Sequence, residues 1–446
     1  MLICGRPEDF LDSIMFKRII KKLVPKKLLY FYHWSLARLA ALYYFFPSNK
    51  LIVIGVTGTN GKTTTVSFIA QYLEALGQKV GSVSTASFKV GSNERLNNKK
   101  MTMLGRFQTQ KFLREAVKNG CRYAVIETSS QGIDQYRHIG INYDVVVFTN
   151  LTPEHIEAHG GWENYKAAKE KLFAHLSGSR NKKIGGRLID KAIVSNGDDQ
   201  ETEILKKFPV DRFFTYSLDK PADLMAERID LSTGHLSFFV DGQKIKTNFL
   251  GRFNVYNILA SLGVVKILGF DLARVADAQL RGVPGRQEWI TAGQDFNVLI
   301  DYAPEPASLE QLYSALKDVK HKRLIHVIGS CGGGRDKARQ PILGKMAGQT
   351  ADLVVVTNED PYDDDPEAII ANVAQGSIEA GKVLGANLFK ISDRRAAIKK
   401  ALTLAKKDDL VLITGKGAEQ FICVANSKKL PWDDRVVVRE ELNKLL

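Results

Sequence analysis

Cysteine is scarce in this sequence, and the four that occur are scattered at Cys4, Cys121, Cys331 and Cys423. No two of them form a C-x-x-C pair, which argues against a zinc ribbon and against a disulfide framework. A cleavable signal peptide is not evident either, because mixed polar residues precede the first apolar run and no small-residue cleavage site follows it. These absences favour the reducing cytosol. We therefore expect a cytoplasmic protein, with the inner face of the membrane as a further option.

Short-period repeats and long low-complexity tracts are also missing from the 446 residues, a length that favours two or three domains. The composition, 44% apolar and 25% charged, is that of a globular protein. The net charge of +14 suits nucleotides, acidic sugar phosphates, nucleic acid or an anionic membrane, and it does not choose among them.

Residues 1–48 differ from the rest of the chain. A basic cluster is followed by an aromatic-rich helical pattern from Leu28 to Phe46, which ends at Pro47. The apolar stretch is about long enough to cross a bilayer, but His33 and Arg38 lie inside it. The pattern therefore fits a basic, amphipathic anchor on a membrane surface, or a helix that packs on the next domain. Both interpretations stay open, and a transmembrane span is the least favoured.

Alternating strands and helices predict an α/β protein with two further domains. Residues 49–283 are expected to form a central domain with a mostly parallel sheet, and residues 284–446 a second doubly wound, Rossmann-like domain. The Pro284-Gly285-Arg286 turn marks the boundary. The predicted strands are Leu51 to Val56, Val80 to Ser84, Tyr123 to Glu127, Asp144 to Thr149, Val298 to Ile300, Leu324 to Ile328, Leu353 to Thr357 and Leu410 to Thr414. Helices are expected at Phe112 to Asn119 and Gly161 to Phe173.

A glycine-rich turn follows the first predicted strand and opens a helix. Gly58 and Gly61 allow backbone N–H groups to approach phosphate oxygens, and the helix N-terminus adds partial positive charge. Lys62 supplies a charge for the outer phosphates, and the Thr63 hydroxyl is placed to ligate Mg²⁺. The spacing departs from G-x-x-x-x-G-K-[ST], because position 56 is Val and the upstream glycine is Gly55. The turn nevertheless predicts an ATP-binding loop.

Three further residues follow the same strand-and-helix pattern. Glu127 ends a predicted strand in the same sheet as the loop, where nucleotide enzymes hold a metal. His155 follows the next strand, and Lys169 shares a helix face with Tyr165. Taken singly, each has an ordinary interpretation as a surface or capping residue.

The Gly58-Thr59-Asn60-Gly61-Lys62-Thr63-Thr64 loop resembles that of the Mur ligases and of folylpolyglutamate synthase, ATP-dependent enzymes that join an amine to a carboxylate through an acyl phosphate. The resemblance implies that Thr63, Glu127, His155 and Lys169 surround Mg²⁺, with Lys169 as a carbamate and with Lys62 also catalytic. It assigns adenine contact to Asn254 and Asn257, phosphate contact to Arg286 and ribose contact to Asp301. Pro304 stands where the family has a histidine.

Motifs in the second domain are similar to those of the UDP-N-acetylmuramyl-tripeptide synthetases within this family. These are Gly334-Arg335-Asp336-Lys337, Asn358-Glu359-Asp360-Pro361 and Gly415-Lys416-Gly417-Ala418-Glu419. The resemblance implies that Arg335, Asp360 and Glu419 bind substrate. Versions that use diaminopimelate carry arginine after that proline, where Tyr362 stands here. We therefore expect another diamino acid, such as L-lysine.

The acceptor is expected to be an acidic, muropeptide-like molecule bound by Thr102, Arg106, Ser130 and Arg137. Residues 1–48 cannot build the UDP-binding domain of typical members, so contact with a membrane and a lipid-linked acceptor are further options. We expect a monomer without a nucleic-acid partner. Two alternatives stay open: a folylpolyglutamate synthase-like ligase, and a non-catalytic, nucleotide-binding membrane adaptor.

Overall fold

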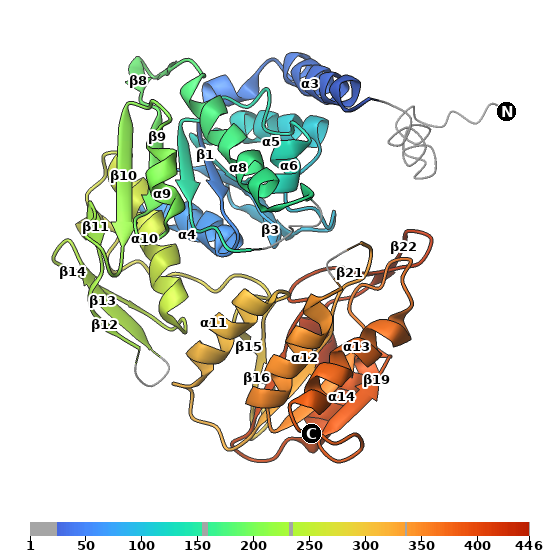
Figure 1. Ribbon diagram of the computed structural model, residues 1–446. Helices are drawn as coiled ribbons and strands as arrows, with labels where there is room; N and C mark the ends of the chain where they lie inside the picture. Colours follow the sequence, from blue (N-terminus) through green and yellow to red (C-terminus); the bar gives the residue numbers. More distant parts are fainter. Residues whose placement is uncertain (1–24, 154–158, 232–234, 335–336, 446) are drawn as a thin grey trace.

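The computed structural model describes residues 25–153, 159–231, 235–334 and 337–445. Figure 1 shows two α/β domains, one above the other, with an N-terminal helix beside the upper domain. Each domain is built around its own sheet, so the α/β class predicted from the sequence is confirmed.

The first sheet has nine strands in the order β11-β10-β9-β6-β1-β5-β2-β3-β4. Its pairs are parallel except for β2 with β3 and β3 with β4, which are antiparallel. The strands are β1 (Ile52–Thr57), β2 (Val80–Val83), β3 (Ser87–Val90), β4 (Asn93–Leu96), β5 (Tyr123–Glu127), β6 (Val145–Phe148), β9 (Ala192–Asn196), β10 (Arg212–Ser217) and β11 (Leu224–Met225). Strands β1, β5, β6 and β9 are buried along their whole length, which explains their unbroken apolar sequences.

Helices cover both faces of this sheet. The apolar side chains of α4 (Lys62–Ala75) and α10 (Arg252–Ile267) join one core cluster, and those of α5 (Arg106–Lys118) and α8 (Trp162–Ser177) join the other. The short helices α6 (Ser130–Asp134) and α9 (Glu201–Leu205) follow strands β5 and β9. The hairpin β7 (Lys182–Ile184) and β8 (Arg187–Ile189), and the antiparallel sheet β12 (Glu227–Asp230), β13 (Leu236–Val240) and β14 (Gln243–Thr247), lie outside the main sheet.

The second sheet has six strands in the order β15-β16-β20-β17-β18-β19, and β15 is an antiparallel edge on an otherwise parallel sheet. Its strands are β15 (Glu288–Trp289), β16 (Asn297–Ile300), β17 (Leu324–Ile328), β18 (Leu353–Thr357), β19 (Leu388–Ile391) and β20 (Leu410–Ile413). Helices α11 (Pro306–Leu316), α12 (Arg339–Thr350) and α13 (Pro366–Glu379) cover one face, and α14 (Arg394–Leu404) and α15 (Asp434–Leu445) the other. The hairpin β21 (Phe421–Val424) and β22 (Lys428–Pro431) precedes α15.

Helix α3 (Lys26–Tyr43) packs on the first domain beside α5. Its contact face is made of small residues, because Ala37, Ala40 and Ala41 are buried. A side chain at Gly140 would place its Cβ 2.9 Å from that of Ala41, so the close approach requires glycine there. Among the residues that the structure describes, no helix is both long and apolar enough to cross a membrane. Two 3₁₀ turns, η1 (Pro47–Lys50) and η3 (Leu272–Arg274), complete the described elements.

Candidate active site

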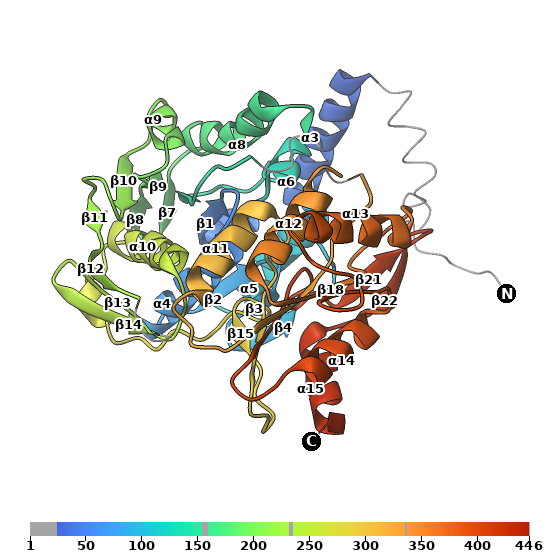
Figure 2. The ribbon, with the colours of Figure 1, turned by 60° about the horizontal axis from the view of Figure 1, so that its bottom comes forward.

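The carboxyl ends of β2, β5, β1, β6 and β9 lie next to one another at one edge of the first sheet. A cavity of about 720 Å³ opens at this edge and is lined by residues of both domains. Figure 2 shows the second domain lying across the first with α11 over the region of β1. Most of the residues predicted to bind substrates line this cavity: Thr59, Asn60, Gly61, Lys62, Thr63, Thr64, Thr102, Glu127, Ser130, Arg137, Asn254, Asn257, Arg286 and Asp301.

The phosphate loop between β1 and α4 has backbone geometry that requires its glycines. Gly58 has φ +148°, and a Cβ on it would lie 1.9 Å from the Thr149 hydroxyl oxygen. Gly61 has φ +81°, and its Cβ would lie 2.3 Å from the side-chain oxygen of Asn257. Helix α4 begins at Lys62 without a side-chain cap, so the amide groups of its first turn point at the cavity end of the loop. The loop therefore has the features of an anion cradle.

Glu127 is buried at the end of β5 and is held by neutral donors. The Thr63 hydroxyl donates to its carboxylate oxygens at 3.0 and 3.1 Å, and the Thr85 backbone N–H donates at 2.6 Å. The Thr85 hydroxyl adds a fourth contact at 3.0 Å. No described lysine or arginine forms an ion pair with Glu127. A buried carboxylate without a cation is unfavourable, and a divalent cation bound between Thr63 and Glu127 would neutralise it. The donor set thus fits Mg²⁺.

Lys169 contacts the phosphate loop at the end away from Glu127. Its side chain comes from α8, it is 4% exposed, and its Nζ donates to the Gly58 carbonyl at 2.6 Å. The same Nζ lies 4.5 Å from the centre of the Tyr165 ring, whose hydroxyl contacts that of Thr59 at 2.9 Å. The structure therefore brings Glu127 and Lys169 to opposite ends of the phosphate loop. His155 lies outside the described residues. His159, which is described, contacts the Ser130 hydroxyl at 3.1 Å.

The two asparagines predicted to contact adenine are buried and bonded to each other. The Asn257 side-chain NH₂ donates to Asn254 at 3.0 Å, and that of Asn254 donates to the Gln287 side chain at 2.8 Å. Gln287 also donates its backbone N–H to Asp301 at 2.7 Å. The network links the first domain to β16 of the second, and Gln287, which sequence reasoning missed, is its centre.

Asp301 and Arg286 lie at the second-domain side of the cavity. Burial raises the pKa of Asp301, while Arg286 and backbone N–H donors act in the opposite direction. The Arg286 guanidinium lies 4.2 Å from the centre of the Tyr302 ring. Its turn packs against the loop after β20, because a Cβ at Gly285 would lie 2.0 Å from the Ala418 nitrogen. Pro304 also lines the cavity, in the position where the expected histidine is missing.

Arg106 and Arg137 lie close together near α6, where Arg137 lines the cavity and Arg106 does not. Arg106 donates to the carbonyl of Gln135, and Arg137 donates to the Gln135 side chain at 2.7 Å and to the Met103 carbonyl at 2.5 Å. Burial and the neighbouring charge of Arg137 lower the pKa of Arg106 to about 10. No described acidic residue pairs with either guanidinium, and the Arg106 Nε is buried without a hydrogen-bond partner. Two like charges held together in this way favour an anionic ligand.

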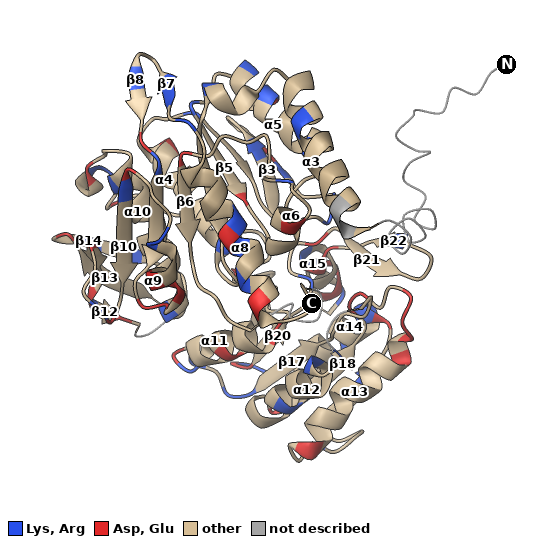
Figure 3. Cartoon of the chain, turned by 45° about the horizontal axis from the view of Figure 1, so that its top comes forward, with Lys and Arg blue, Asp and Glu red and all other residues tan. Residues whose placement is uncertain are grey.

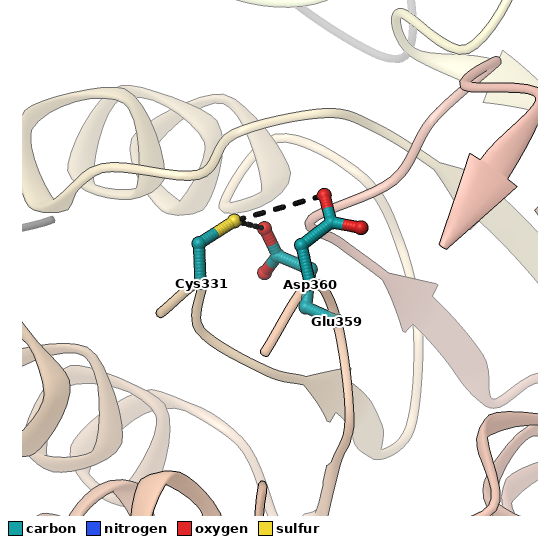
Figure 4. A group of neighbouring side chains, drawn as sticks. All are labelled: Cys331, Glu359 and Asp360. Atoms are coloured by element: carbon teal, nitrogen blue, oxygen red, sulfur yellow. Dashed lines mark hydrogen bonds between the residues drawn. The ribbon is translucent and has the colours of Figure 1, made fainter. Parts of the chain in front are cut away.

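A second polar cluster lies at the carboxyl edge of the second sheet. Cys331 donates its thiol to Glu359 at 2.7 Å, and Asp360 lies beside them (Figure 4). Burial and the charge of Asp360 raise the pKa of Glu359. These three residues have the spacing of a possible metal site, but Asp360 already has two lysine partners. The cluster is therefore balanced by ammonium groups.

The lysine partners of Asp360 come from different domains. Lys416 contacts both of its carboxylate oxygens at 3.0 Å and contacts Glu419 at 2.6 Å. Lys100, from the first domain, pairs with Asp360 and lies 3.4 Å from Glu419. Although burial by itself raises it, these ammonium groups hold the pKa of Asp360 below its usual value. Sequence reasoning missed this contact, because the partners are 260 residues apart.

The remaining acidic residues after Asp360 have structural partners. Asp364 accepts from the Gly333 N–H at 2.8 Å, Asp363 accepts from the Asn426 N–H at 2.9 Å, and Asp365 caps α13. These contacts hold the turn that follows Asp360 and the start of α13. Arg335 lies outside the described residues. Thr85 and Asn150 were also missed, although both follow predicted strands and so obey the rule that site residues lie at strand ends.

Comparison with known proteins agrees with this arrangement. The Mur ligase middle domain matches residues 56–265, and the Mur ligase, glutamate ligase domain matches residues 285–417. The UDP-N-acetylmuramoyl-L-alanyl-D-glutamate--2,6-diaminopimelate ligase of Geobacillus kaustophilus is 36% identical over 416 residues, covering 91% of this chain and 81% of that protein. The UDP-N-acetylmuramyl-tripeptide synthetase of Roseiflexus sp. is 37% identical over 420 residues, covering 92% and 82%. A solved structure of a diaminopimelate ligase of this kind has a TM-score of 0.58 at 32% identity and covers 89% of this chain and 79% of its own.

Proposed function

This chain belongs to the Mur ligase family, and we propose that it adds a diamino acid to a carboxylate of an acidic, peptidoglycan-precursor-like acceptor. It is an ATP-dependent ligase that forms an amide bond. The observation that carries the finer proposal is the single cavity that holds the phosphate loop, the Glu127 carboxylate and the Arg137 guanidinium. These groups suit the three parts of the reaction: a nucleotide, a metal and an anionic acceptor.

In the proposed reaction, residues at the edge of the first sheet and residues of the second domain that face it bind ATP. The loop amides and Lys62 bind the ATP phosphates, and Asn254, Asn257, Arg286 and Asp301 bind its adenine, phosphates and ribose. When bound, Mg²⁺ supplies charge neutralisation for the phosphoryl group that is transferred. Thr63 and Glu127 hold it, with His155 and Lys169 as the further proposed ligands.

Lys169 takes part in this proposal as a carbamate. Its neutral amine attacks the carbon of CO₂, an N–C bond forms, one C=O electron pair moves to oxygen, and the nitrogen gives up a proton. The product is an anion in place of a cation, and an anion can ligate Mg²⁺. The burial of Lys169 beside the loop supports the idea, because desolvation favours the neutral amine that reacts.

The reaction itself proceeds in two displacements. The acceptor carboxylate attacks the terminal phosphorus of ATP, ADP leaves, and an acyl phosphate forms. The amine of the amino acid then attacks the acyl carbon, a proton is lost from nitrogen, and phosphate leaves. We assign the acceptor to Arg106, Arg137, Thr102 and Ser130, and the amino acid to the cluster around Asp360 and Glu419, with Arg335. The domains exclude water that would otherwise hydrolyse the acyl phosphate.

The identity of the amino acid rests on two opposed observations. Tyr362 cannot form the bidentate pair that an arginine makes with a second carboxylate, which favours lysine. The Lys100 ammonium, however, lies 5.9 Å from the centre of the Tyr362 ring and offers a cation to such a carboxylate, and the named Geobacillus relative uses diaminopimelate. Lysine remains the proposal from the sequence, and diaminopimelate is the competitor that the test must include.

The test measures phosphate release from ATP with muropeptide-like acceptors crossed with lysine, ornithine and diaminopimelate. The proposal expects release that depends on both acceptor and amino acid. Release that needs folate and glutamate would establish the folylpolyglutamate synthase-like alternative, and nucleotide binding without any turnover would establish the adaptor. If diaminopimelate is the substrate through Lys100, then Lys100→Met raises its KM and leaves that of lysine unchanged.

A second experiment tests the carbamate. Lys169→Ala should abolish turnover, and a small carboxylic acid should restore part of it by entering the space of the lost side chain. Lys166→Ala is the matched control, because Lys166 lies on the same helix and pairs with Glu201. Full activity of Lys169→Ala contradicts the carbamate assignment.

We also infer a cytoplasmic enzyme. Cys121, Cys331 and Cys423 are buried and free, as in a protein of a reducing compartment. The N-terminal helix gives an independent reason to place the enzyme at the inner face of a membrane.

A further inference from the structure

Helix α3 carries exposed apolar residues on the side that faces away from the domain. The helical repeat places them on one face in two groups, residues 28–32 and residues 39–43, and Ser35 lies on that face between the groups. All are exposed, and Phe31 has 64% of its surface accessible. The outward stripe consists of Leu28, Phe31, Tyr32, Leu39, Leu42 and Tyr43.

The opposite face of α3 is apolar too, because Ala37, Ala40 and Ala41 pack on the first domain. A surface helix normally pairs one apolar face with one polar face, and a helix that is apolar all round is normally buried. The apolar residues of the outward stripe are therefore not buried by the folding of the described chain. Isolated exposed apolar residues need no explanation, but a contiguous set of them marks an interaction surface.

Two aromatic residues extend the stripe beyond the helix. Phe107 at the start of α5 is exposed and packs against Tyr43, with 6.2 Å between ring centres. Phe45 is 75% exposed and has φ +60°, a backbone conformation that is unfavourable for a bulky residue. The strained turn after α3 thus adds another exposed ring next to the end of the helix.

Basic residues predominate around the outward stripe, and Glu115 of α5, 4.0 Å from Lys111, is an acidic exception. No acidic residue occurs between Asp12 and Glu74, a segment that contains all of α3. Arg38 is exposed on the flank of the helix, and Lys111 is exposed one turn after Phe107 on α5. Upstream, the sequence carries Lys17, Arg18, Lys21 and Lys22. Figure 3 shows several basic residues and little acid along α3 and α5.

We propose that the outward stripe of α3 docks the protein on an anionic lipid bilayer. A helix that lies flat in the interface buries an apolar face among the acyl chains while basic groups at its borders meet the lipid phosphates. Tyrosine and tryptophan suit this depth because their rings are apolar with a polar group, and Tyr32, Tyr43 and Trp34 lie along the stripe or its flank. The shortness of the helix is no obstacle, because docking does not require a span.

Charge disfavours a second copy of the chain as the occupant. A symmetric contact through this face would bring the same basic residues of two copies together, and like charges repel. An anionic bilayer instead supplies the opposite sign over the whole face. The proposal does not depend on the ligase reaction, because it uses none of the residues that line the cavity.

The test is flotation of the full-length protein with vesicles of phosphatidylglycerol and phosphatidylcholine, compared with vesicles of phosphatidylcholine alone. Leu28→Ser, Leu39→Ser and Leu42→Ser are combined in one variant. The matched control combines Ile378→Ser, Val383→Ser and Leu384→Ser, three similarly exposed aliphatic residues of the second domain. Circular dichroism and nucleotide binding confirm that both variants are folded.

We expect the wild type and the control to float with the anionic vesicles, and the stripe variant to lose about tenfold or more of its bound fraction. Arg38→Glu with Lys111→Glu should also reduce binding, and salt should weaken that of the wild type. Equal flotation of the stripe variant and the control overturns the proposal, as does a wild type that stays with the dense fraction. A wild type that forms dimers which the stripe variant loses, without flotation, assigns the face to a second copy and also overturns it.

Discussion

The two sheet edges of this protein treat buried carboxylates in opposite ways. Glu127, at the edge of the first sheet, is surrounded by hydroxyl and backbone N–H donors, and no described lysine or arginine pairs with it. Asp360, at the edge of the second sheet, is bonded to Lys416 and Lys100. Among the described residues, the carboxylate at the edge of the first sheet has no cationic partner, whereas the carboxylate at the edge of the second sheet has two. The difference supports the proposal that the edge of the first sheet binds an external cation, and it can be tested by removing each charge.

The largest expected effect is that of Glu127→Gln on activity. The substitution keeps the size of the side chain but removes the charge proposed to hold Mg²⁺, so turnover should fall about a thousandfold. The free energy of unfolding without metal should change by no more than about 1 kcal/mol, because the lost charge had no cationic partner. Phosphate release and chemical denaturation measure the two quantities, with Glu115→Gln on the surface of α5 as the control. If Glu127→Gln lost several kcal/mol of stability, the proposed difference between Glu127 and Asp360 would be contradicted.

Asp360→Asn should have the reverse profile in the stability assay. It leaves Lys416, whose side chain is fully buried, without half of its partners, and breaking a buried ion pair of this kind costs about 3 kcal/mol. Asp363→Asn in the same loop, at an exposed carboxylate, should cost less than about 1 kcal/mol. Denaturation of both variants checks the difference, and equal stabilities would show that the lysines do not depend on Asp360.

Added Mg²⁺ should stabilise the first edge specifically. A ligand that binds the folded state contributes about 2.7 kcal/mol at a hundred times its dissociation constant. Thermal unfolding of the wild type should therefore shift upward with Mg²⁺ and nucleotide, whereas Glu127→Gln should show little shift from the metal and Asp360→Asn should respond as the wild type does. A shift that is lost in Asp360→Asn instead would assign the cation to the second edge.

The smallest effect concerns pH and a histidine beneath the second edge. His326 is buried in β17 between Tyr313 and Thr414, and burial together with Arg394 lowers its pKa to about 3. The folded state thus binds fewer protons than the unfolded state below pH 6.5, so the contribution of His326 to stability is present above that pH and is lost as pH falls toward 3. Between pH 6.5 and 5 the loss is about 2 kcal/mol. His326→Gln should show a shallower dependence in denaturation series, and an unchanged slope would contradict the assignment.

The sequence predicted the strands better than the helix ends. Strands β5, β17 and β18 have the predicted limits, because an unbroken apolar run is followed directly by polar residues. Helix α5 begins at Arg106, although the apolar spacing predicted a start at Phe112. Phe107 in its first turn is exposed, so the buried apolar spacing begins later, and Gly105 gives no side-chain cap.

In the candidate site, some residues could be predicted from local sequence patterns and others could not. The sequence could place the phosphate loop, Glu127 and Lys169 near one another because each lies at a strand end or on a patterned helix near the loop, while their roles stay predictions. Gln287 and Lys100 were missed, because their contacts join residues of different domains, and no local pattern encodes the distance between domains. Predicted roles at His155 and Arg335 stay predictions, since both lie outside the described residues.

The Lys100–Asp360 contact links the separation of the two domains to the charge that a substrate would meet at Asp360. The two side chains belong to different domains, so any motion that widens the cavity must separate them and leave Asp360 with Lys416 alone. A substrate that carries an ammonium group would then meet a carboxylate that has just lost a partner. Such an ammonium group would take the place of Lys100 beside Asp360, so substrate binding and the contact between the domains would compete for one carboxylate.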